Sequence, residues 1–242
     1  MIHPKFISFL FVLLVVFLYT ALLLLLRWAL AQRQYTAANI RRVMLWPRIG
    51  LAGWFLLTGF LAMRGIFSDF QSTPPKIALV VAPALVGTLL LGLGHWFRET
   101  YDHCNPRVIV GLQSFRIVME IILYLLFLNN SLPKLLTFEG RNFDMIVGLS
   151  APIVTRLWMK PGYEKWGWVF VWNMAGLALV INVATHGILA APTSFQVFDT
   201  SPPNTVIADF PYIWLPTFVV PMAIFLHIVS IRHCLSNLKK PA

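Results

Sequence analysis

The chain has 242 residues, of which 58% are hydrophobic and 12% are charged. Soluble domains carry about 25% charged residues, so this composition excludes an ordinary soluble domain and indicates an integral membrane protein. The formal net charge of +10 is therefore read as a topology signal, and we expect no nucleic-acid partner. The two cysteines, Cys104 and Cys234, lie far apart and form no redox or metal-binding motif.

Seven apolar segments are long enough to be membrane spans, since a spanning helix needs about 20 mostly apolar residues. They cover residues 6–31, 49–68, 76–98, 107–129, 143–159, 167–190 and 209–233. The fifth is the shortest and contains Pro152. We predict an all-α fold, a seven-transmembrane-helix bundle that forms one domain over residues 1–242 in the cell membrane.

The direction of the bundle follows from its basic loops, because short loops rich in Lys and Arg stay on the cytoplasmic side. The first connection contains five arginines between Arg27 and Arg48, which places the N-terminus outside. With seven spans, the connection with Arg98 and Arg107, the stretch "RLWMKPGYEK" and the tail "IRHCLSNLKKPA" also fall inside. The C-terminus is then cytoplasmic.

The first apolar segment has a competing interpretation, because "ALAQ" at residues 29–32 resembles a signal-peptide cleavage site. Its apolar stretch of about 20 residues exceeds the roughly 7 to 15 of a signal peptide. Cleavage would also leave the arginine-rich connection outside. We therefore predict a retained first helix.

The fourth segment carries a polar stripe within an apolar sequence. Gln113, Arg116 and Glu120 are spaced three and four residues apart, so they share one helix face. Ionisable residues at membrane depth are costly, and they usually face a protein interior or a water-filled cavity. The stripe indicates either a buried Arg116–Glu120 ion pair or a polar cavity.

Three further polar residues are expected at a similar height in the outer part of the bundle. At a rise of 1.5 Å per residue, Glu120 lies about 21 Å above the inner boundary, and Arg64 and Asn182 lie at about 24 Å. His186 follows Asn182 by four residues on the same face. We expect Arg64, Asn182 and His186 to line an outward-facing cavity together with the polar stripe.

Two outer loops add candidate binding elements. The loop "FEGRNFD" contains Glu139, Arg141, Asn142 and Asp144 immediately before the fifth span. Asp144 also has a structural explanation, because a helix N-terminus stabilises a carboxylate. The long loop "APTSFQVFDTSPPNTVIADFP" before the last span is expected to cap the cavity, as loops of more than about 12 residues often act as lids.

Other chemistries are less well supported by the sequence. His95 and His227 could supply the two axial ligands of a haem from facing helices, whereas zinc at His186 would lack a complete ligand set. A retinal-type receptor needs a lysine within a helix, and the seventh segment has none. We find no nucleotide-binding or catalytic-triad motif, so we predict no enzymatic activity and no cofactor.

The sequence leaves three functional hypotheses open. The first is a transport or permeation protein that takes a small solute or ion into the polar cavity. The second is a non-transporting membrane subunit or receptor whose outer loops bind a ligand or partner. The third is a haem-binding redox subunit. The expected partners are the lipid bilayer, the solute or ion, and further copies or subunits in a membrane complex.

Overall fold

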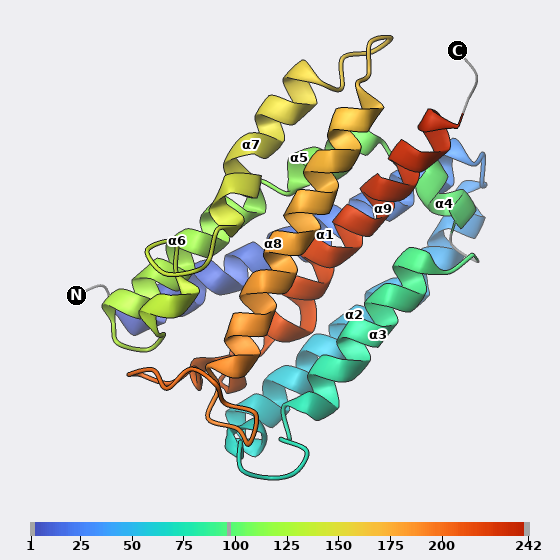
Figure 1. The fold of residues 1–242 in the computed structure, drawn as a ribbon. Helices are drawn as coiled ribbons and strands as arrows, with labels where there is room; N and C mark the ends of the chain where they lie inside the picture. The colour runs from blue at the N-terminus through green and yellow to red at the C-terminus, as the bar shows by residue number, and fades with distance from the viewer. Residues whose placement is uncertain (1–2, 96–97, 240–242) are drawn as a thin grey trace.

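A computed structural model describes residues 3–95 and 98–239, and the regular elements in these ranges are all helical (Figure 1). The main helices are α1 (Pro4–Gln32), α2 (Ala37–Met63), α3 (Ala78–Leu93), α4 (Arg98–Asp102), α5 (Pro106–Leu112), α6 (Phe115–Leu128), α7 (Asp144–Leu157), α8 (Trp166–Leu189) and α9 (Val220–Leu238). Short helical turns are η1 (Ile66–Ser68), η2 (Lys134–Leu136), η3 (Val206–Ala208) and the π-helical turn η4 (Leu215–Val219).

Five of these helical stretches are long and apolar enough to cross a membrane: Pro4–Gln32, Ala37–Met63, Pro106–Leu128, Trp166–Leu189 and Leu215–Leu238. The third joins α5 to α6, and the fifth joins η4 to α9. The chain is thus a multi-pass, all-helical membrane protein, as its composition indicated. The other two apolar segments form shorter helices, the 16-residue α3 and the 14-residue α7.

Several helix ends differ from the sequence prediction for local reasons. α2 begins twelve residues before the predicted 49, because the Thr36 hydroxyl accepts a hydrogen bond from Asn39 N and caps the helix there. The predicted seventh span starts six residues later, at η4, where Pro216 lacks an amide hydrogen and the helix opens into a π turn. α3 ends at Leu93, and residues 96–97 of its predicted span lie outside the described residues.

The helices run between two ends of the molecule. The start of α1 and the loops 64–77, 129–143 and 190–214 lie at the lower left of Figure 1. The turn between α1 and α2, α4, the loop between α7 and α8, and the end of α9 lie at the other end. α9 is the most buried of the five long stretches and packs against α3, α5 and α8.

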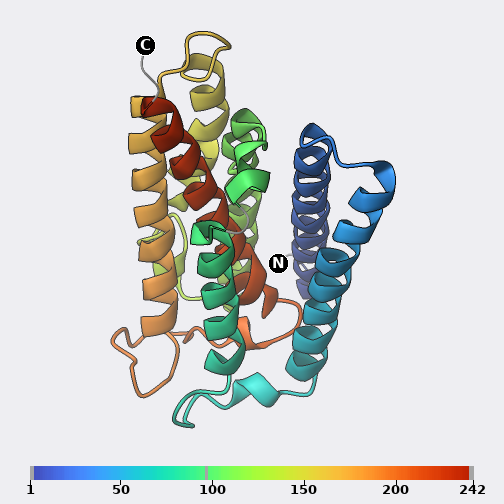
Figure 2. The same ribbon diagram turned by 90° about the vertical axis from the view of Figure 1, so that its right-hand side faces the viewer.

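The α1–α2 pair lies to one side of the other helices (Figure 2). Aromatic side chains join it to the start of the last helix. Trp54 Nε1 donates to Thr217 O, and Trp214 Nε1 donates to Phe55 O, both at 3.3 Å. The Phe55 ring packs edge-on against Phe218, with centroids 4.8 Å apart. Both of these partly buried indole N–H groups therefore have a backbone acceptor, as tryptophans removed from water usually do.

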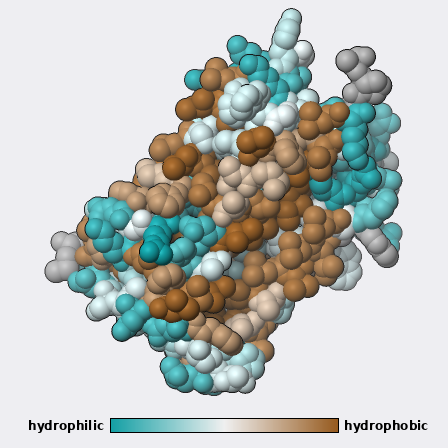
Figure 3. Space-filling model, in the orientation of Figure 1, coloured by the Kyte–Doolittle hydropathy of each residue, from teal (hydrophilic) through white to brown (hydrophobic). Residues whose placement is uncertain are grey.

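The outer surface of the bundle is apolar between polar ends. Large side chains such as Leu56, Leu90 and Trp168 are more than half exposed along the helices. Figure 3 shows brown, hydrophobic atoms over the middle of one face and hydrophilic atoms toward its ends. Exposed apolar area on this scale is unusual for a soluble monomer, and it fits helices that face lipid.

Candidate functional site

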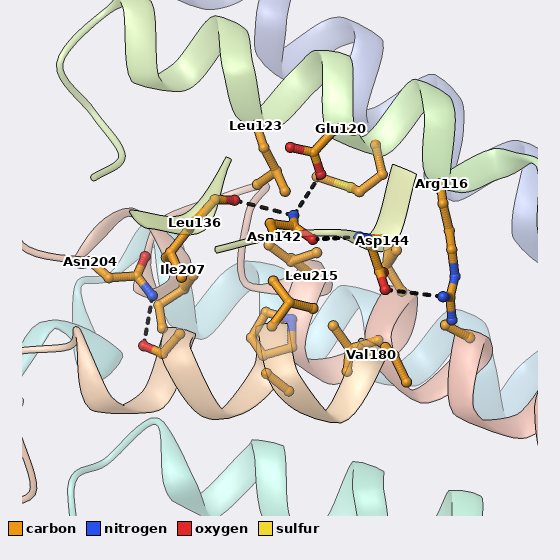
Figure 4. A pocket seen from close by; sticks show the side chains of 18 of the residues that line it. Arg116, Glu120, Leu123, Leu136, Asn142, Asp144, Val180, Asn204, Ile207 and Leu215 are labelled. Atoms are coloured by element: carbon orange, nitrogen blue, oxygen red, sulfur yellow. Dashed lines mark hydrogen bonds and ion pairs between the residues drawn. The ribbon is translucent and has the colours of Figure 1, made fainter. Parts of the chain in front are cut away.

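A cavity of about 130 Å³ lies between α6, α8 and the start of the last helix (Figure 4). Most of its wall is apolar and includes Leu123, Val180 and Leu215. The α6–α7 loop contributes Leu136 and Asn142, and the long α8–α9 loop contributes Asn204 and Ile207. Side chains of both loops thus line the cavity, including two from the long loop that the sequence predicted as a cap.

Arg116 is the largest of the fully buried side chains, with 2% of its surface exposed. Its Nη1 donates to Asp144 Oδ1 at 3.0 Å and to Gly176 O at 3.4 Å. Its Nε and Nη2 have no hydrogen-bond partner among the described residues, although both are buried. Arg116 therefore joins α6 to α7 and α8 through one nitrogen and leaves its Nε–Nη2 edge unused.

Glu120 lies one turn after Arg116 on α6, and both its oxygens accept hydrogen bonds from neutral donors. Phe138 N donates to Oε1 at 2.7 Å, and Asn142 Nδ2 donates to Oε2 at 2.5 Å. The Arg116–Glu120 ion pair, one of the two alternatives that the sequence left open, is therefore wrong, because Asp144 takes the place of Glu120 beside the guanidinium. Glu120 instead fastens the α6–α7 loop to α6.

Asn142 connects the two carboxylates. Its Nδ2 also donates to Leu136 O at 3.2 Å, and its Oδ1 accepts from Asp144 N at 3.1 Å, which satisfies one free amide at the start of α7. The loop folds tightly at Gly140, where an added Cβ would lie 2.2 Å from Lys134 O. We call Arg116, Glu120, Asn142 and Asp144 the outer cluster.

The remaining predicted cavity residues lie elsewhere. Gln113 lies at the end of α5, one turn before Arg116, where it is buried and its Nε2 donates to Ala223 O at 3.3 Å. Asn182 donates to Arg141 O at 2.8 Å and does not line the cavity. His186 Nδ1 donates to Asn182 O at 2.9 Å, and its ring stacks on Phe198. Asn182 and His186 thus contact the α6–α7 and α8–α9 loops and do not line the cavity.

Arg64 and two residues of the α6–α7 loop are at the molecular surface. Arg64 is exposed at the end of α2, with its guanidinium over the Phe60 ring, so it is not part of the cavity wall. Glu139 accepts from the Tyr124 hydroxyl and pairs with Lys134, and these contacts lower its pKa. Arg141 stacks over Phe198, with 5.5 Å between its Cζ and the ring centroid.

A second set of buried polar side chains, which the sequence did not predict as a set, lies between α8 and α9. Asn173 donates to Ser230 Oγ at 2.8 Å, and its Oδ1 lies 2.8 Å from His227 Nδ1. We call Asn173, His227 and Ser230 the inner cluster. The three-residue spacing of His227 and Ser230 was an available signal for one shared face, but it did not identify Asn173 as their partner.

The two haem-ligand candidates are not arranged as an axial pair. The His227 ring lies between Asn173 and Gly176, and an added Cβ at Gly176 would approach its Nε2 to 2.6 Å. His95 is exposed beyond the end of α3. Among the described residues, no group of three or more His, Cys, Asp and Glu side chains could hold a metal ion.

The fold and the cavity define a class, the multi-pass helical membrane proteins with a small-molecule-sized cavity among their helices. Residues 74–235 match the family model described as "Domain of unknown function (DUF8737)", and the chain belongs to this family. No curated protein and no solved structure matches the chain. The matched region contains all residues of both clusters and begins after α2.

Proposed function

We propose that this chain is a transport or permeation protein of the cell membrane that binds a small solute in the cavity. The proposal includes seven membrane segments, with α3 and α7 as short spans, an external N-terminus and a cytoplasmic C-terminus. The alternation of the helices between two ends supports it (Figure 1). The basic connections fall at the end opposite the cavity loops, which agrees with cytoplasmic retention of Lys and Arg.

One observation carries the binding proposal: Arg116 lines an apolar cavity, and its buried Nε and Nη2 have no hydrogen-bond partner among the described residues. A buried donor without an acceptor costs about 1 to 3 kcal/mol, so a solute that supplies acceptors would gain that energy. The Nε and Nη2 donors of a guanidinium match the two oxygens of a carboxyl group. We therefore propose an apolar solute with one carboxyl head group.

The size of the cavity limits the solute. An engineered apolar cavity of about 150 Å³ accommodates benzene, so 130 Å³ accommodates a small apolar body. The walls formed by Leu123, Val180 and Leu215 favour an aliphatic body over a polar one. Medium-chain carboxylic acids combine these properties. Octanoate is larger than benzene, but the cavity is not fully enclosed, so part of its chain extends beyond this volume, and octanoate serves as the probe.

Charge balance favours uptake of a proton with the solute. Arg116, Glu120 and Asp144 sum to a formal charge of −1, and no other ionisable side chain among the described residues lines the cavity. A bound carboxylate would change the formal net charge of this buried site from −1 to −2, and unpaired buried charge is costly. We expect octanoate to bind more tightly at pH 5 than at pH 8, with net proton uptake measured by calorimetry in two buffers.

Binding of radiolabelled octanoate to the purified chain in lipid nanodiscs tests the cavity. Ala184 lines the cavity, so Ala184→Leu should fill it and weaken octanoate binding at least tenfold. The matched control is Ala178→Leu, which places the same side chain on an exposed position of α8. An equal loss of octanoate affinity in both variants would show that the cavity is not the binding site.

Transport is tested separately with octanesulfonate, because its permanent charge prevents simple diffusion through the bilayer. Proteoliposomes with the wild-type chain should take it up faster than protein-free vesicles and faster than Ala184→Leu proteoliposomes. Uptake equal to that of protein-free vesicles would end the transport proposal while leaving binding intact.

A second candidate is a non-transporting receptor or subunit that binds the same solute. The attachment of the α6–α7 loop to Glu120 through Phe138 N and Asn142 favours it, because solute binding next to this carboxylate would be transmitted to an outer loop. This candidate predicts octanoate binding without octanesulfonate flux, together with a change in hydrogen exchange of residues 132–143 on binding.

A further inference from the structure

A second unsatisfied polar atom lies at the other end of the cavity. Asn204 is 1% exposed, its Nδ2 donates to Gly187 O at 2.9 Å, and its Oδ1 has no hydrogen-bond partner among the described residues. The Asn204 backbone is held as well, because its N–H donates to Ala190 O at 3.1 Å. The amide oxygen is therefore a fixed, buried acceptor that lacks a donor.

Arg116 and Asn204 lie at opposite ends of the cavity (Figure 4). α8 provides a scale for their separation, since Arg116 contacts Gly176 O and Asn204 contacts Gly187 O. Eleven residues separate these two glycines, which corresponds to about 16 Å along a helix. The side chains between the two ends are apolar on the α8 side, with Val180 and Val183 as examples.

We propose that the cavity binds a solute with a polar group at each end, a carboxyl group on Arg116 and a hydroxyl or N–H donor on Asn204. This inference rests on the proposed function, because it uses the same cavity and the same carboxyl site. Hydrogen bonds of about 3 Å at each end leave roughly 10 Å for the solute. An extended chain of about eight carbon atoms spans that length.

The two ends also set the orientation of the solute. Asn204 belongs to the α8–α9 loop at the outer end of the bundle, whereas Arg116 contacts Gly176 deeper along α8. The carboxyl group therefore lies at the inner end and the donor group beneath the outer loop. A purely aliphatic chain would leave the Asn204 oxygen buried without a donor, so the cavity discriminates against it.

The test compares 8-hydroxyoctanoate with octanoate in competition binding to the full chain in nanodiscs. The wild type should bind 8-hydroxyoctanoate about two- to tenfold more tightly, the range expected for one added buried hydrogen bond. Asn204→Ala should bring this ratio to one while octanoate still binds. The ratio is measured within each variant, so a general loss of stability does not imitate the effect.

The matched control is Asn182→Ala, which removes an asparagine of α8 that bonds a loop carbonyl but does not line the cavity. It should keep the wild-type ratio. Equal binding of both probes to the wild type would overturn the two-ended solute while leaving the carboxyl site standing. Binding of neither probe would overturn the proposed function and this inference together.

Discussion

The outer and inner clusters are both buried polar groups, but they differ in what surrounds them. The outer cluster lines the cavity, and Arg116 in it keeps two nitrogens without partners. In the inner cluster Asn173 bonds both Ser230 and His227, and His227 Nε2 also has no partner among the described residues, but this cluster lines no part of that cavity. Burial of polar groups alone therefore does not mark a binding site. Unused hydrogen-bonding capacity beside a cavity is the stronger indication.

The two clusters meet at Gly176. Its carbonyl accepts from Arg116 Nη1, and its Cα side faces the His227 ring. A steric change at Gly176 can therefore affect both clusters.

The largest expected effect comes from breaking the buried ion pair. Arg116→Met leaves Asp144 without its cation, and losing one partner of a buried pair costs about 3 to 5 kcal/mol. Thermal unfolding in detergent should show a large fall in Tm. Replacing Asp144 by Leu in the same chain should recover much of this loss, because an apolar pair often substitutes well for a buried ion pair.

In the same variants, octanoate binding is expected to respond differently from stability. The recovered Arg116→Met/Asp144→Leu double variant should still bind no octanoate, since the carboxyl site is absent. A double variant that is stable and binds octanoate with wild-type affinity would show that the outer cluster, like the inner one, serves only the fold.

The next largest effect is expected at the junction of the clusters. Gly176→Ala places a Cβ 2.4 Å from His227 Cε1, and overpacking of this kind costs about 1 to 3 kcal/mol. Gly167→Ala is the matched control. Gly167 is on the same helix, and no neighbouring atom lies within 4 Å of its added Cβ. Chemical unfolding of the two variants should differ clearly. Equal stability would mean that the His227 ring moves aside at little cost.

A comparable loss of stability is expected within the inner cluster. Asn173→Ala removes the hydrogen bonds to Ser230 and His227 and should lower the free energy of unfolding by about 1 to 3 kcal/mol. Octanoate affinity, measured below the lowered Tm, should stay within about twofold of wild type. A loss of affinity without a loss of stability would show that the inner cluster takes part in solute binding.

The sequence was sufficient for the elements that depend on apolar length and helix period. It predicted a polar face on the fourth segment, and Gln113, Arg116 and Glu120 are all buried. The partner of Arg116 was not deducible from that spacing, because a neighbour four residues away competes with residues brought in by a loop. Asp144 wins since the loop turns back at Gly140 and places the start of α7 beside α6.

The heights of polar residues along their helices, estimated from the helix rise, also did not predict which residues meet. Asn182 and Glu120 are similar in estimated height, yet Asn182 bonds Arg141 O instead of facing the cavity. Height along a helix says nothing about its rotation about its own axis. Asn204 was missed for a different reason: it lies in a long loop, where neither period nor depth predicts which side chain turns inward.

The smallest expected effect is at the Asp69–Lys76 pair in the loop before α3, where the two side chains are 3.0 Å apart in solvent. The hydrogen bond from Lys76 lowers the pKa of Asp69 below its usual value. The pair therefore stabilises the fold above that usual value, near pH 4, and the contribution is lost as the pH falls through the lowered pKa. Lys76→Ala should slightly lower Tm at pH 7 and leave it unchanged at pH 2. Because water screens this pair, its effect should also fade at high salt, whereas the buried Arg116–Asp144 pair should respond to neither salt nor the Lys76 substitution.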